Sequence, residues 1–469
     1  MEGHKRPRVF FKFLAVFLFV TIILILYYNN IERTHSSTST LFQHRPRPGR
    51  LKFLPVYVWS TKIPTKFTGK LVKERSGSDG NTRKHSMVKR KSFNYTFNYV
   101  EAVNCKKMLN GNKPELDRAT SLLSNNYRNS ISNTWYFVKT KNCDSFISER
   151  GYVTDSLTSE ERDFPIAYSI LMFKDVEQFE RLLRAIYRPQ NYYCIHVDAK
   201  VTEDIYNAVR GIVGCLDNVF MTRKYVDVQW GTFSVLEPEL ICMKMLFKYK
   251  NWKYFINLTG QEFPLKTNYE IVKILETYNG ANDMEGTVRR ANIARWSKAG
   301  VSPPHNIRPV KGSVHIVVNR DFVDYVLNNK TATDFLEWVK NVDVPDETYF
   351  SSLNHNPQLG IPGSYKGIPE TTKDKKPFLA RFKNWGREPF DWPCRGKRVR
   401  LICIFGMGDL PLLARRKEMF ANKFYLNFEP FALDCLEELH HNKTRDEYLG
   451  LLKFNTSYYQ GLDFIKNKI

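Results

Sequence analysis

Apolar residues follow two alternating spacings from residue 164 onward, and each spacing predicts a different element. The run 166–173 is almost entirely apolar, which predicts a buried strand. Behind Asp175, a suitable N-cap, the apolar residues of 176–186 recur every three or four positions and predict a helix that ends before Pro189. The same alternation predicts strands at 192–197, 219–222 and 254–258 and helices at 202–216, 233–247 and 267–277. Strands separated by helices indicate parallel βαβ units.

The C-terminal third is less periodic. Its apolar runs predict strands at 313–319 and 400–405. Pro345 places Asp346 and Glu347 at a loop-to-helix junction, where acidic residues are common.

Asp198 stands at the carboxyl end of a predicted strand, where α/β sheets bind their ligands. Its position favours a ligand contact and a plain capping or loop role equally. No GxGxxG follows the first strand, and the chain contains no GxxxxGK[ST]. Dinucleotide and P-loop nucleotide sites therefore lack support.

The first thirty residues indicate the cellular compartment of the chain. Basic side chains precede an uncharged run over 13–28, which the apolar 9–11 extend. Residues 9–28 therefore predict a signal-anchor helix that can cross a hydrocarbon core of about 30 Å. The bases before it predict a cytosolic tail at 1–8 and a lumenal remainder. A cleaved signal peptide is disfavoured because bulky residues fill 26–30.

Composition and charge narrow the class of protein. The chain has 469 residues, a formal net charge of +23, 42% hydrophobic residues and 14% aromatic ones, which excludes a mostly disordered or collagen-like protein. Residues 1–100 carry +15 of that charge. We interpret 29–100 as a solvated, self-repelling stem. The alternative is a stem that binds acidic glycans or a membrane surface. A lumenal location leaves nucleic acid without support as a partner.

The cysteines and the sequons matter once the chain is placed in an oxidising lumen. Eight cysteines can all pair there, and the absence of any Cys-x-x-Cys argues against a zinc knuckle or a thioredoxin-like site. Asn257 begins a sequon inside the apolar run 254–258, so we expect it to be buried and unmodified. Glycosylation is predicted at the other sequons, Asn94, Asn329, Asn442 and Asn455.

Several long segments, in the same order along the chain, resemble one enzyme family. They are PQNYYCIHVD at 189–198, NLTGQEFPLKTN at 257–268, PDE at 345–347, VRLICIFG at 399–406 and FANKF at 420–424. From about residue 165 to 436 the chain resembles the core 2 β-1,6-N-acetylglucosaminyltransferases of glycosyltransferase family 14. A short anchor and stem before the catalytic domain is also the layout of Golgi glycosyltransferases.

The resemblance implies an α/β fold of the GT-A-like class, with a Rossmann-like mixed sheet. It implies a lumenal catalytic domain at 101–445 and a C-terminal extension at 446–469, in a single-pass type II protein of the Golgi membrane. The family lacks the Asp-x-Asp metal motif and this chain contains none, so we expect no metal and no other cofactor. The resemblance also implies four disulfides: Cys105–Cys435, Cys143–Cys215, Cys194–Cys242 and Cys394–Cys403.

The implied reaction is the inverting transfer of N-acetylglucosamine (GlcNAc) from UDP-GlcNAc to a sugar hydroxyl. It needs a base for the acceptor's proton and positive charge for the departing diphosphate. By resemblance Glu347 is the base, and Arg400 and Lys423 bind the diphosphate. Glu347 could instead be an ordinary first-turn acid, and the two cations ordinary strand and surface residues. The resemblance further implies donor contacts at Asp198, Leu171 and Trp230 and acceptor contacts at Glu285, Arg295 and Trp385.

The acceptor half departs from the family pattern. Asn292 replaces a family lysine, and Arg387 replaces a tyrosine. The leading expectation is core 2 branching of Galβ1-3GalNAc on Ser or Thr of glycoproteins. The alternatives are I-branching of poly-N-acetyllactosamine, a xylosyltransferase-like activity and a non-catalytic Golgi glycan-binding protein. A homodimer also stays open.

Overall fold

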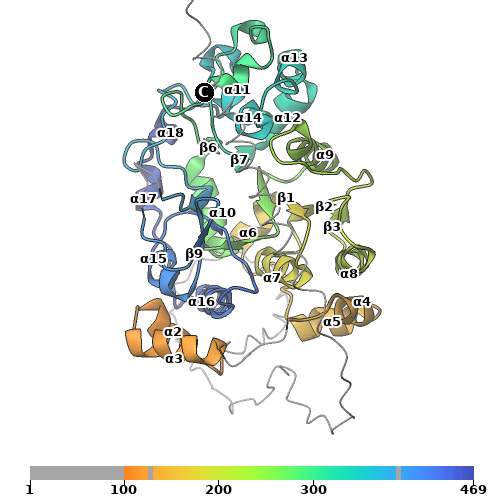
Figure 1. Ribbon diagram of the computed structural model, residues 1–469, viewed down its shortest axis with the longest axis vertical. Helices are drawn as coiled ribbons and strands as arrows, with labels where there is room; N and C mark the ends of the chain where they lie inside the picture. The colour runs from red at the N-terminus through yellow and green to blue at the C-terminus, as the bar shows by residue number, and fades with distance from the viewer. Residues whose placement is uncertain (1–99, 125–129, 387–391) are drawn as a thin grey trace, which may run out of the picture. The chain divides into compact units, whose positions relative to one another are not determined.

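A six-stranded mixed sheet organises the part of the chain that the structure, a computed structural model, describes: residues 100–124, 130–386 and 392–469. All described residues belong to one compact unit of the chain. The strand order is β3-β2-β1-β4-β7-β6 (Figure 1). The strands are β1 (Ile166–Met172), β2 (Tyr192–Val197), β3 (Val219–Met221), β4 (Tyr254–Thr259), β6 (Asp283–Met284) and β7 (Ile316–Asn319).

The first four strands pair in parallel, as the βαβ pattern predicts. β7 runs antiparallel to both β4 and β6, so the sheet is mixed. β7 begins three residues later than the predicted 313–319, because Ser313 and His315 turn toward polar partners before the strand starts. The predicted mixed α/β sheet is confirmed, and the arrangement agrees with a GT-A-like fold.

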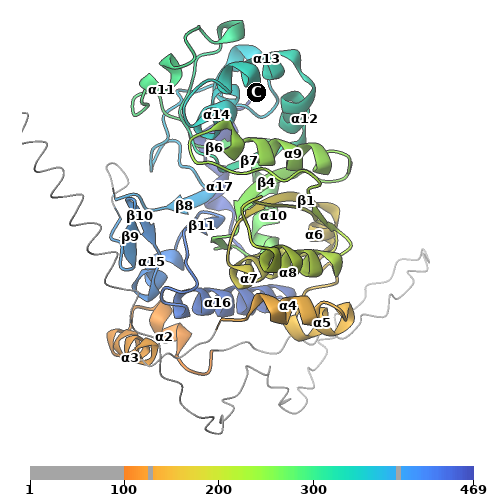
Figure 2. The ribbon, with the colours of Figure 1, turned by 45° about the vertical axis from the view of Figure 1, so that its right-hand side comes forward.

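Helices cover both faces of this sheet. On one side lie α7 (Val176–Ile186), α8 (Glu203–Gly214) and α10 (Asn268–Tyr278), and on the other α9 (Glu237–Leu246), α12 (Arg320–Asn328) and α13 (Lys330–Val339) (Figure 2). Residues of β1 alternate between the two cores: Tyr168 and Ile170 belong to the first, and Ala167 to the second. Both cores are apolar, which explains why the sequence of β1 shows a continuous apolar run.

Local signals set the ends of these helices. The Asp175 side chain accepts a hydrogen bond from the N–H of Gln178, as expected for the N-cap of α7. Thr267 and Glu270 form a capping box at the start of α10. The predicted helix 233–247 is split into a short 3-10 turn, η1 (Phe233–Val235), and α9. Pro238 lies in the first turn of α9, where its missing N–H does no harm.

A smaller sheet and a hairpin lie beside the main sheet. The three-stranded sheet has the order β5-β11-β8, with β5 (Glu262–Pro264), β11 (Phe420–Asn422) and β8 (Arg381–Lys383). The hairpin consists of β9 (Lys397–Val399) and β10 (Ile402–Ile404). The predicted strand 400–405 is therefore wrong at its start, because Arg400 and Leu401 form the hairpin turn.

The remaining elements complete the unit. They are α2 (Cys105–Leu109), α3 (Lys113–Leu123), α4 (Asn133–Lys139), α5 (Cys143–Arg150), α6 (Ser159–Asp163), α11 (Ala294–Ser297), η2 (Pro304–Asn306), η3 (Pro345–Glu347), α14 (Tyr349–Asn354), η4 (Pro357–Leu359), η5 (Met407–Asp409), α15 (Leu410–Leu413), α16 (Phe431–Tyr448), α17 (Ser457–Gln460) and α18 (Asp463–Lys466). The predicted C-terminal extension, 446–469, packs onto the catalytic part: the ring of Phe464 lies 5.0 Å from that of Tyr278 in α10.

All four predicted disulfides are present. Cys105–Cys435 joins α2 to α16, Cys143–Cys215 joins α5 to the end of α8, and Cys194–Cys242 joins β2 to α9. Cys394–Cys403 closes a short loop around the β9–β10 hairpin. Each bond restricts the unfolded chain, which by a chain-entropy model contributes about 3–5 kcal/mol for long loops.

The predicted membrane-spanning helix requires a correction. Among the described residues, none of the helices combines the length and the apolar character that a bilayer crossing needs. The longest of them, α16, has 18 residues and carries acidic and basic side chains along its length. The described residues therefore form a mixed α/β fold, and the fold-class prediction is corrected to that fold. The segments predicted as tail, anchor and stem, 1–8, 9–28 and 29–100, lie outside the described residues except for residue 100, and Asn94 also lies outside them.

Candidate active site

Glu347 ends the 3-10 helix η3 and is separated from α14 by Thr348 alone, in agreement with the predicted loop-to-helix junction. Its carbonyl oxygen accepts a hydrogen bond from the N–H of Gly312 at 2.7 Å. Val344, which precedes η3, has a φ of 53° and donates its N–H to the Gly231 carbonyl oxygen. Three separate chain segments therefore meet at Glu347 and fix its backbone.

Two cations hold the Glu347 carboxylate. Its Oε2 lies 2.6 Å from Arg295 Nη1 and 3.3 Å from Lys311 Nζ. Arg295 lies on α11, and the neighbouring Trp296 donates its indole N–H to Thr348 Oγ1 at 3.1 Å. α11 is thereby attached to the residue that follows Glu347. The structure thus brings the predicted base and one predicted acceptor residue into direct contact.

Glu285, a second predicted acceptor residue, follows β6 close to the same place. Its carboxylate pairs with Lys383 Nζ at 3.0 Å, and its carbonyl oxygen accepts from Ser351 Oγ of α14. Burial opposes ionisation, but the charges of Lys383 and Lys311 outweigh it and lower the pKa of Glu285 to about 2. Glu285 is therefore ionised at any physiological pH and can accept hydrogen bonds from sugar hydroxyls.

Two of the three predicted donor residues, Leu171 and Asp198, lie at the carboxyl ends of parallel strands, whereas Trp230 lies in the loop between β3 and η1. Leu171 pairs with Thr259 of β4 near the end of β1. Asp198 follows β2, and its carboxylate accepts from the N–H and the ammonium of Lys200 at 2.9 and 3.0 Å. Trp230 is 80% exposed. It borders a cavity of about 880 Å³ that is also lined by Phe233, Arg295, Lys298, Lys340 and Val344.

The two predicted diphosphate ligands come from different strands. Arg400 is exposed at the tip of the β9–β10 hairpin, and Lys423 directly follows β11. The Lys423 carbonyl oxygen accepts from the N–H of Phe405, which attaches it to the end of β10. Burial lowers the pKa of Lys423, and the positive charges of Lys174 and Arg400 lower it further against the opposing effect of Glu262. Mutual repulsion between cations is what an anion would relieve on binding.

Comparison with known proteins decides the family. The family model for the Core-2/I-Branching enzyme matches residues 166–413. Human β-1,3-galactosyl-O-glycosyl-glycoprotein β-1,6-N-acetylglucosaminyltransferase is 37% identical over 363 residues, which cover 72% of this chain and 84% of the relative. This chain belongs to the Core-2/I-Branching enzyme family. A second human enzyme of that name, numbered 3, is 35% identical over 376 residues (74% and 85%), and that of bovine herpesvirus 4 is 36% identical over 363 (72% and 82%).

The predicted enzyme class is thereby confirmed: the chain is a β-1,6-N-acetylglucosaminyltransferase. Within this Core-2/I-Branching enzyme, the third predicted acceptor residue, Trp385, stands apart from Glu285 and Arg295 in sequence. It follows β8 and is 44% exposed. An exposed indole can stack on the apolar face of a sugar ring.

Sequence reasoning missed the lysines that hold the two carboxylates. Lys311 pairs with Glu347, and Lys383 pairs with Glu285 and donates to Ser313 Oγ at 2.8 Å. Lys383 ends β8, a strand that the sequence did not predict, and Lys311 has no local signal at all. Both roles arise from segments that meet only in the folded chain.

A buried ionic network beneath the site was also missed. Glu262, at the start of β5, accepts from Arg381 Nε at 2.6 Å and lies 2.7 Å from His315 Nε2. Despite burial, the charge of Arg381 lowers the pKa of Glu262 to about 2. Burial lowers the pKa of His315 to about 4, so the imidazole is neutral near pH 7. The signal for this network was present in the family segment 257–268, which contains Glu262.

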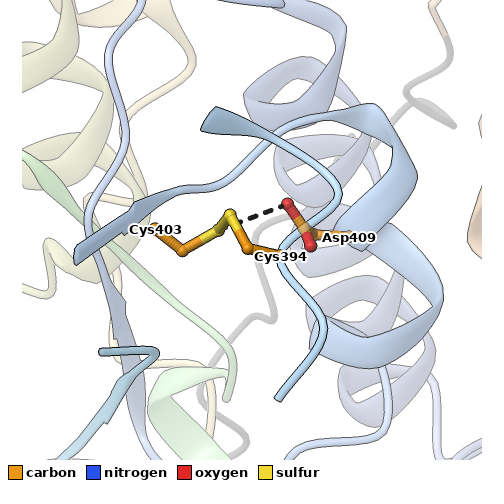
Figure 3. A group of neighbouring side chains, drawn as sticks. All are labelled: Cys394, Cys403 and Asp409. Atoms are coloured by element: carbon orange, nitrogen blue, oxygen red, sulfur yellow. Dashed lines mark hydrogen bonds between the residues drawn. A yellow bond between two sulfur atoms is a disulfide. The ribbon is translucent and has the colours of Figure 1, made fainter. Parts of the chain in front are cut away.

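Three groups with metal-ligating atoms also lie together near the hairpin. The ligand atoms of Cys394, Cys403 and Asp409 fall within 4.8 Å of one another (Figure 3). Both sulfurs belong to a disulfide, so they are not available as thiolate ligands. Asp409 instead accepts from the N–H groups of Arg395 and Gly406 and fixes the loop.

The sequons differ in their surroundings. Asn257 is buried and hydrogen-bonded through both ends of its amide, to Val314 and Ile316. Asn329 caps α13, and Asn442 lies within α16. Asn455 is exposed after α16.

Proposed function

We propose that this enzyme transfers GlcNAc from UDP-GlcNAc to core 1, Galβ1-3GalNAc on Ser or Thr, in β-1,6 linkage and with inversion. The names of its relatives describe transfer to β-1,3-galactosyl-O-glycosyl-glycoproteins, which supports this acceptor. The observation that carries the proposal is the contact of Glu347 with Arg295. It unites a proton-accepting group with an acceptor-binding group, and Arg295 also lines the open cavity beside Trp230.

Glu347 acts as the general base in the proposed mechanism. The acceptor hydroxyl gives its proton to a Glu347 carboxylate oxygen while its own oxygen bonds to the anomeric carbon of GlcNAc. The bond from that carbon to the diphosphate oxygen breaks on the opposite face, and its electron pair leaves with UDP. Arg295 and Lys311 orient the carboxylate, and Glu285 accepts hydrogen bonds from the acceptor sugar.

Arg400 and Lys423 stabilise the diphosphate as it leaves. Arginine offers a planar fork of donors and lysine a compact point charge, so the pair suits a diphosphate without a metal ion. Positive charge that is already fixed in place requires no reorganisation during the reaction. The exposed Trp230, with Leu171 and Asp198 at the strand ends, provides surface for the uridine part.

The proposed place of this reaction is the lumen of the Golgi. Four disulfides support an oxidising compartment, because cytosolic proteins seldom keep such bonds. Glycoprotein acceptors and nucleotide sugars also meet in the lumen of the secretory pathway.

A donor and acceptor matrix tests the proposal. The full-length chain, purified from a eukaryotic secretory host, is incubated with UDP-GlcNAc or UDP-xylose and with core 1, core 3 or poly-N-acetyllactosamine acceptors. We expect transfer from UDP-GlcNAc to core 1, with the new linkage identified by NMR as β-1,6. Transfer to poly-N-acetyllactosamine alone would replace the proposal with I-branching. Transfer from UDP-xylose would indicate the xylosyltransferase alternative, and glycan binding without turnover a non-catalytic protein.

A further inference from the structure

Arg398 contacts the chain next to two proposed substrate-binding residues: Arg400, which binds the donor, and Trp385, which binds the acceptor. It belongs to β9, two residues before Arg400, and its guanidinium reaches the segment that carries Trp385. We propose that Arg398 is a positioning residue that couples the donor-binding turn to the acceptor-binding tryptophan. The inference rests on the proposed function, from which it takes the roles of Arg400 and Trp385.

The first contact of Arg398 stabilises the turn that holds Arg400. Arg400 and Leu401 have φ values of 49° and 75°, and they form a two-residue turn between paired strands. Turns of this kind usually contain Asn or Gly, because the left-handed conformation disfavours other side chains. Arg398 Nη1 donates to the Leu401 carbonyl oxygen at 2.9 Å. The guanidinium therefore supports a turn whose own sequence does not favour it.

The second set of contacts made by Arg398 lies on the segment that carries Trp385. Arg398 Nη1 donates to the Asn384 carbonyl oxygen at 3.3 Å, and Nη2 donates to Asn384 Oδ1 at 3.2 Å. Nη2 also reaches the Trp392 carbonyl oxygen at 3.4 Å. Asn384 is fully buried and immediately precedes Trp385. The backbone from which the Trp385 side chain extends is thus held by the same guanidinium as the Arg400 turn.

Backbone pairing strengthens the connection. The Asn384 carbonyl oxygen also accepts from the N–H of Cys403 at 2.8 Å, and Cys403 is the strand partner of Arg398. The Cys394–Cys403 disulfide fixes that position (Figure 3). The Asn384 carbonyl oxygen therefore accepts hydrogen bonds from both the hairpin backbone and the Arg398 side chain.

Gly386 shows how closely the guanidinium packs on this segment. Its φ is 60°, and a Cβ added there would collide with the guanidinium of Arg398. The chain just after Trp385 therefore lies against the guanidinium, with no room for a side chain between them. A lysine at position 398 has its donors on one nitrogen and lacks the planar fork whose two nitrogens reach Asn384, Trp392 and Leu401.

The test compares the Michaelis constants of the two substrates in the full-length enzyme. For Arg398→Ala we expect the KM for UDP-GlcNAc and the KM for the acceptor each to rise about tenfold, as the loss of one or two hydrogen bonds per side implies. Arg400→Ala should raise mainly the donor KM, and Trp385→Ala mainly the acceptor KM. Arg398→Lys should recover only part of the loss. Arg415→Ala, at an exposed arginine after α15, is the matched control and should change neither.

Two further measurements make the outcome decisive. If Arg398 acts through Arg400, the two substitutions should not act independently. The fold increase in the donor KM of the Arg398→Ala, Arg400→Ala double variant should then be well below the product of the fold increases in the two single variants. Gly386→Ala displaces the guanidinium without removing it and should also raise both KM values. If Arg398→Ala shows no cooperative melting transition, it is not folded, and the KM values of Gly386→Ala then test the coupling. A rise in only one KM, or in neither, would overturn the coupling.

Failure of the proposed function would look different. If the wild type does not transfer to core 1, the acceptor assignment fails, and the same KM comparison is made with whichever glycan of the matrix is used. Calorimetric titration with UDP measures the donor side without any acceptor. Unchanged UDP affinity in Arg398→Ala, alongside weakened affinity in Arg400→Ala, would reject the role of Arg398 whatever the acceptor is.

Discussion

In the proposed mechanism, the single residues of this site divide into fixed charges and one reactive group. Glu285 is ionised by its lysine neighbours, with a pKa of about 2, which suits a group that binds a sugar and keeps its charge. Burial, followed by the negative charge of Glu347, raises the pKa of the adjacent Asp346 to about 7. Asp346 is buried whereas the Glu347 side chain is part-exposed, so Glu347 is the member of the pair that an acceptor can reach.

The first prediction tests Glu347 as the base. Glu347→Gln keeps the shape of the side chain but cannot accept the proton, so kcat should fall by about 10²–10⁴-fold. The UDP affinity, measured by calorimetry, should stay within about twofold of wild type. Glu337→Gln, which neutralises an exposed glutamate of α13, is the matched control and should retain full activity. Near wild-type turnover in Glu347→Gln would reject the assigned base.

The second prediction concerns Lys423, one of the two cations that we propose take the place of a metal ion. Lys423→Met preserves length but removes the charge, so kcat/KM should fall by about 10²–10³-fold, the usual effect of losing one charge-stabilising group. Lys417→Met, at an exposed lysine before β11, should have no such effect. Wild-type activity should persist in excess EDTA. Complete loss in EDTA that manganese restores would contradict a metal-free mechanism.

At the scale of elements, the spacing of apolar residues predicted the helices and strands that bury one regular set of side chains. The βαβ segments appeared in the sequence because each buries apolar residues at a constant spacing, as β1 and α7 do. The break before α9 depends on Pro238, and the turn at Arg400 contradicts the preferences of its own residues. Lys311 and Arg398 were invisible because their partners lie far along the chain or in backbone carbonyls, which leave no pattern in the sequence.

The third prediction follows from the contact between α16 and α10. Burial, followed by the charge of Glu270, raises the pKa of Glu447 from an ordinary 4.5 to about 8. The folded state therefore binds a proton that the unfolded state releases above pH 4.5. The stability that this proton gives is complete below pH 4.5 and is lost as the pH rises toward 8.

Glu447→Gln removes that dependence. In urea unfolding under non-reducing conditions, the free energy of unfolding of the variant relative to wild type should increase steadily from pH 5 to pH 8. Glu337→Gln provides a surface comparison and should follow wild type throughout. A difference that shrinks over this pH range would show that Glu447 is ionised in the folded enzyme.

At the scale of the whole molecule, the disulfides have two separate roles. Cys105–Cys435 spans 330 positions and joins the first described helix to α16, whereas Cys394–Cys403 spans nine. A chain-entropy model assigns about 5 kcal/mol or more to the long closure and about 3 kcal/mol or less to the short one. Only the short one adjoins the Arg400 turn. Stability and donor binding should therefore depend on different bonds.

The fourth prediction separates these two roles. Replacing Cys105 and Cys435 by serine should lower Tm by roughly 5–8 °C while the UDP affinity of the folded enzyme stays unchanged. Replacing Cys394 and Cys403 by serine should lower Tm less but weaken UDP binding, because β10 and the Arg400 turn lose their covalent support. Differential scanning calorimetry and UDP titration below both melting transitions measure the two effects. Equal UDP affinity in both variants would mean that Arg398 and the strand pairing hold Arg400 without the disulfide.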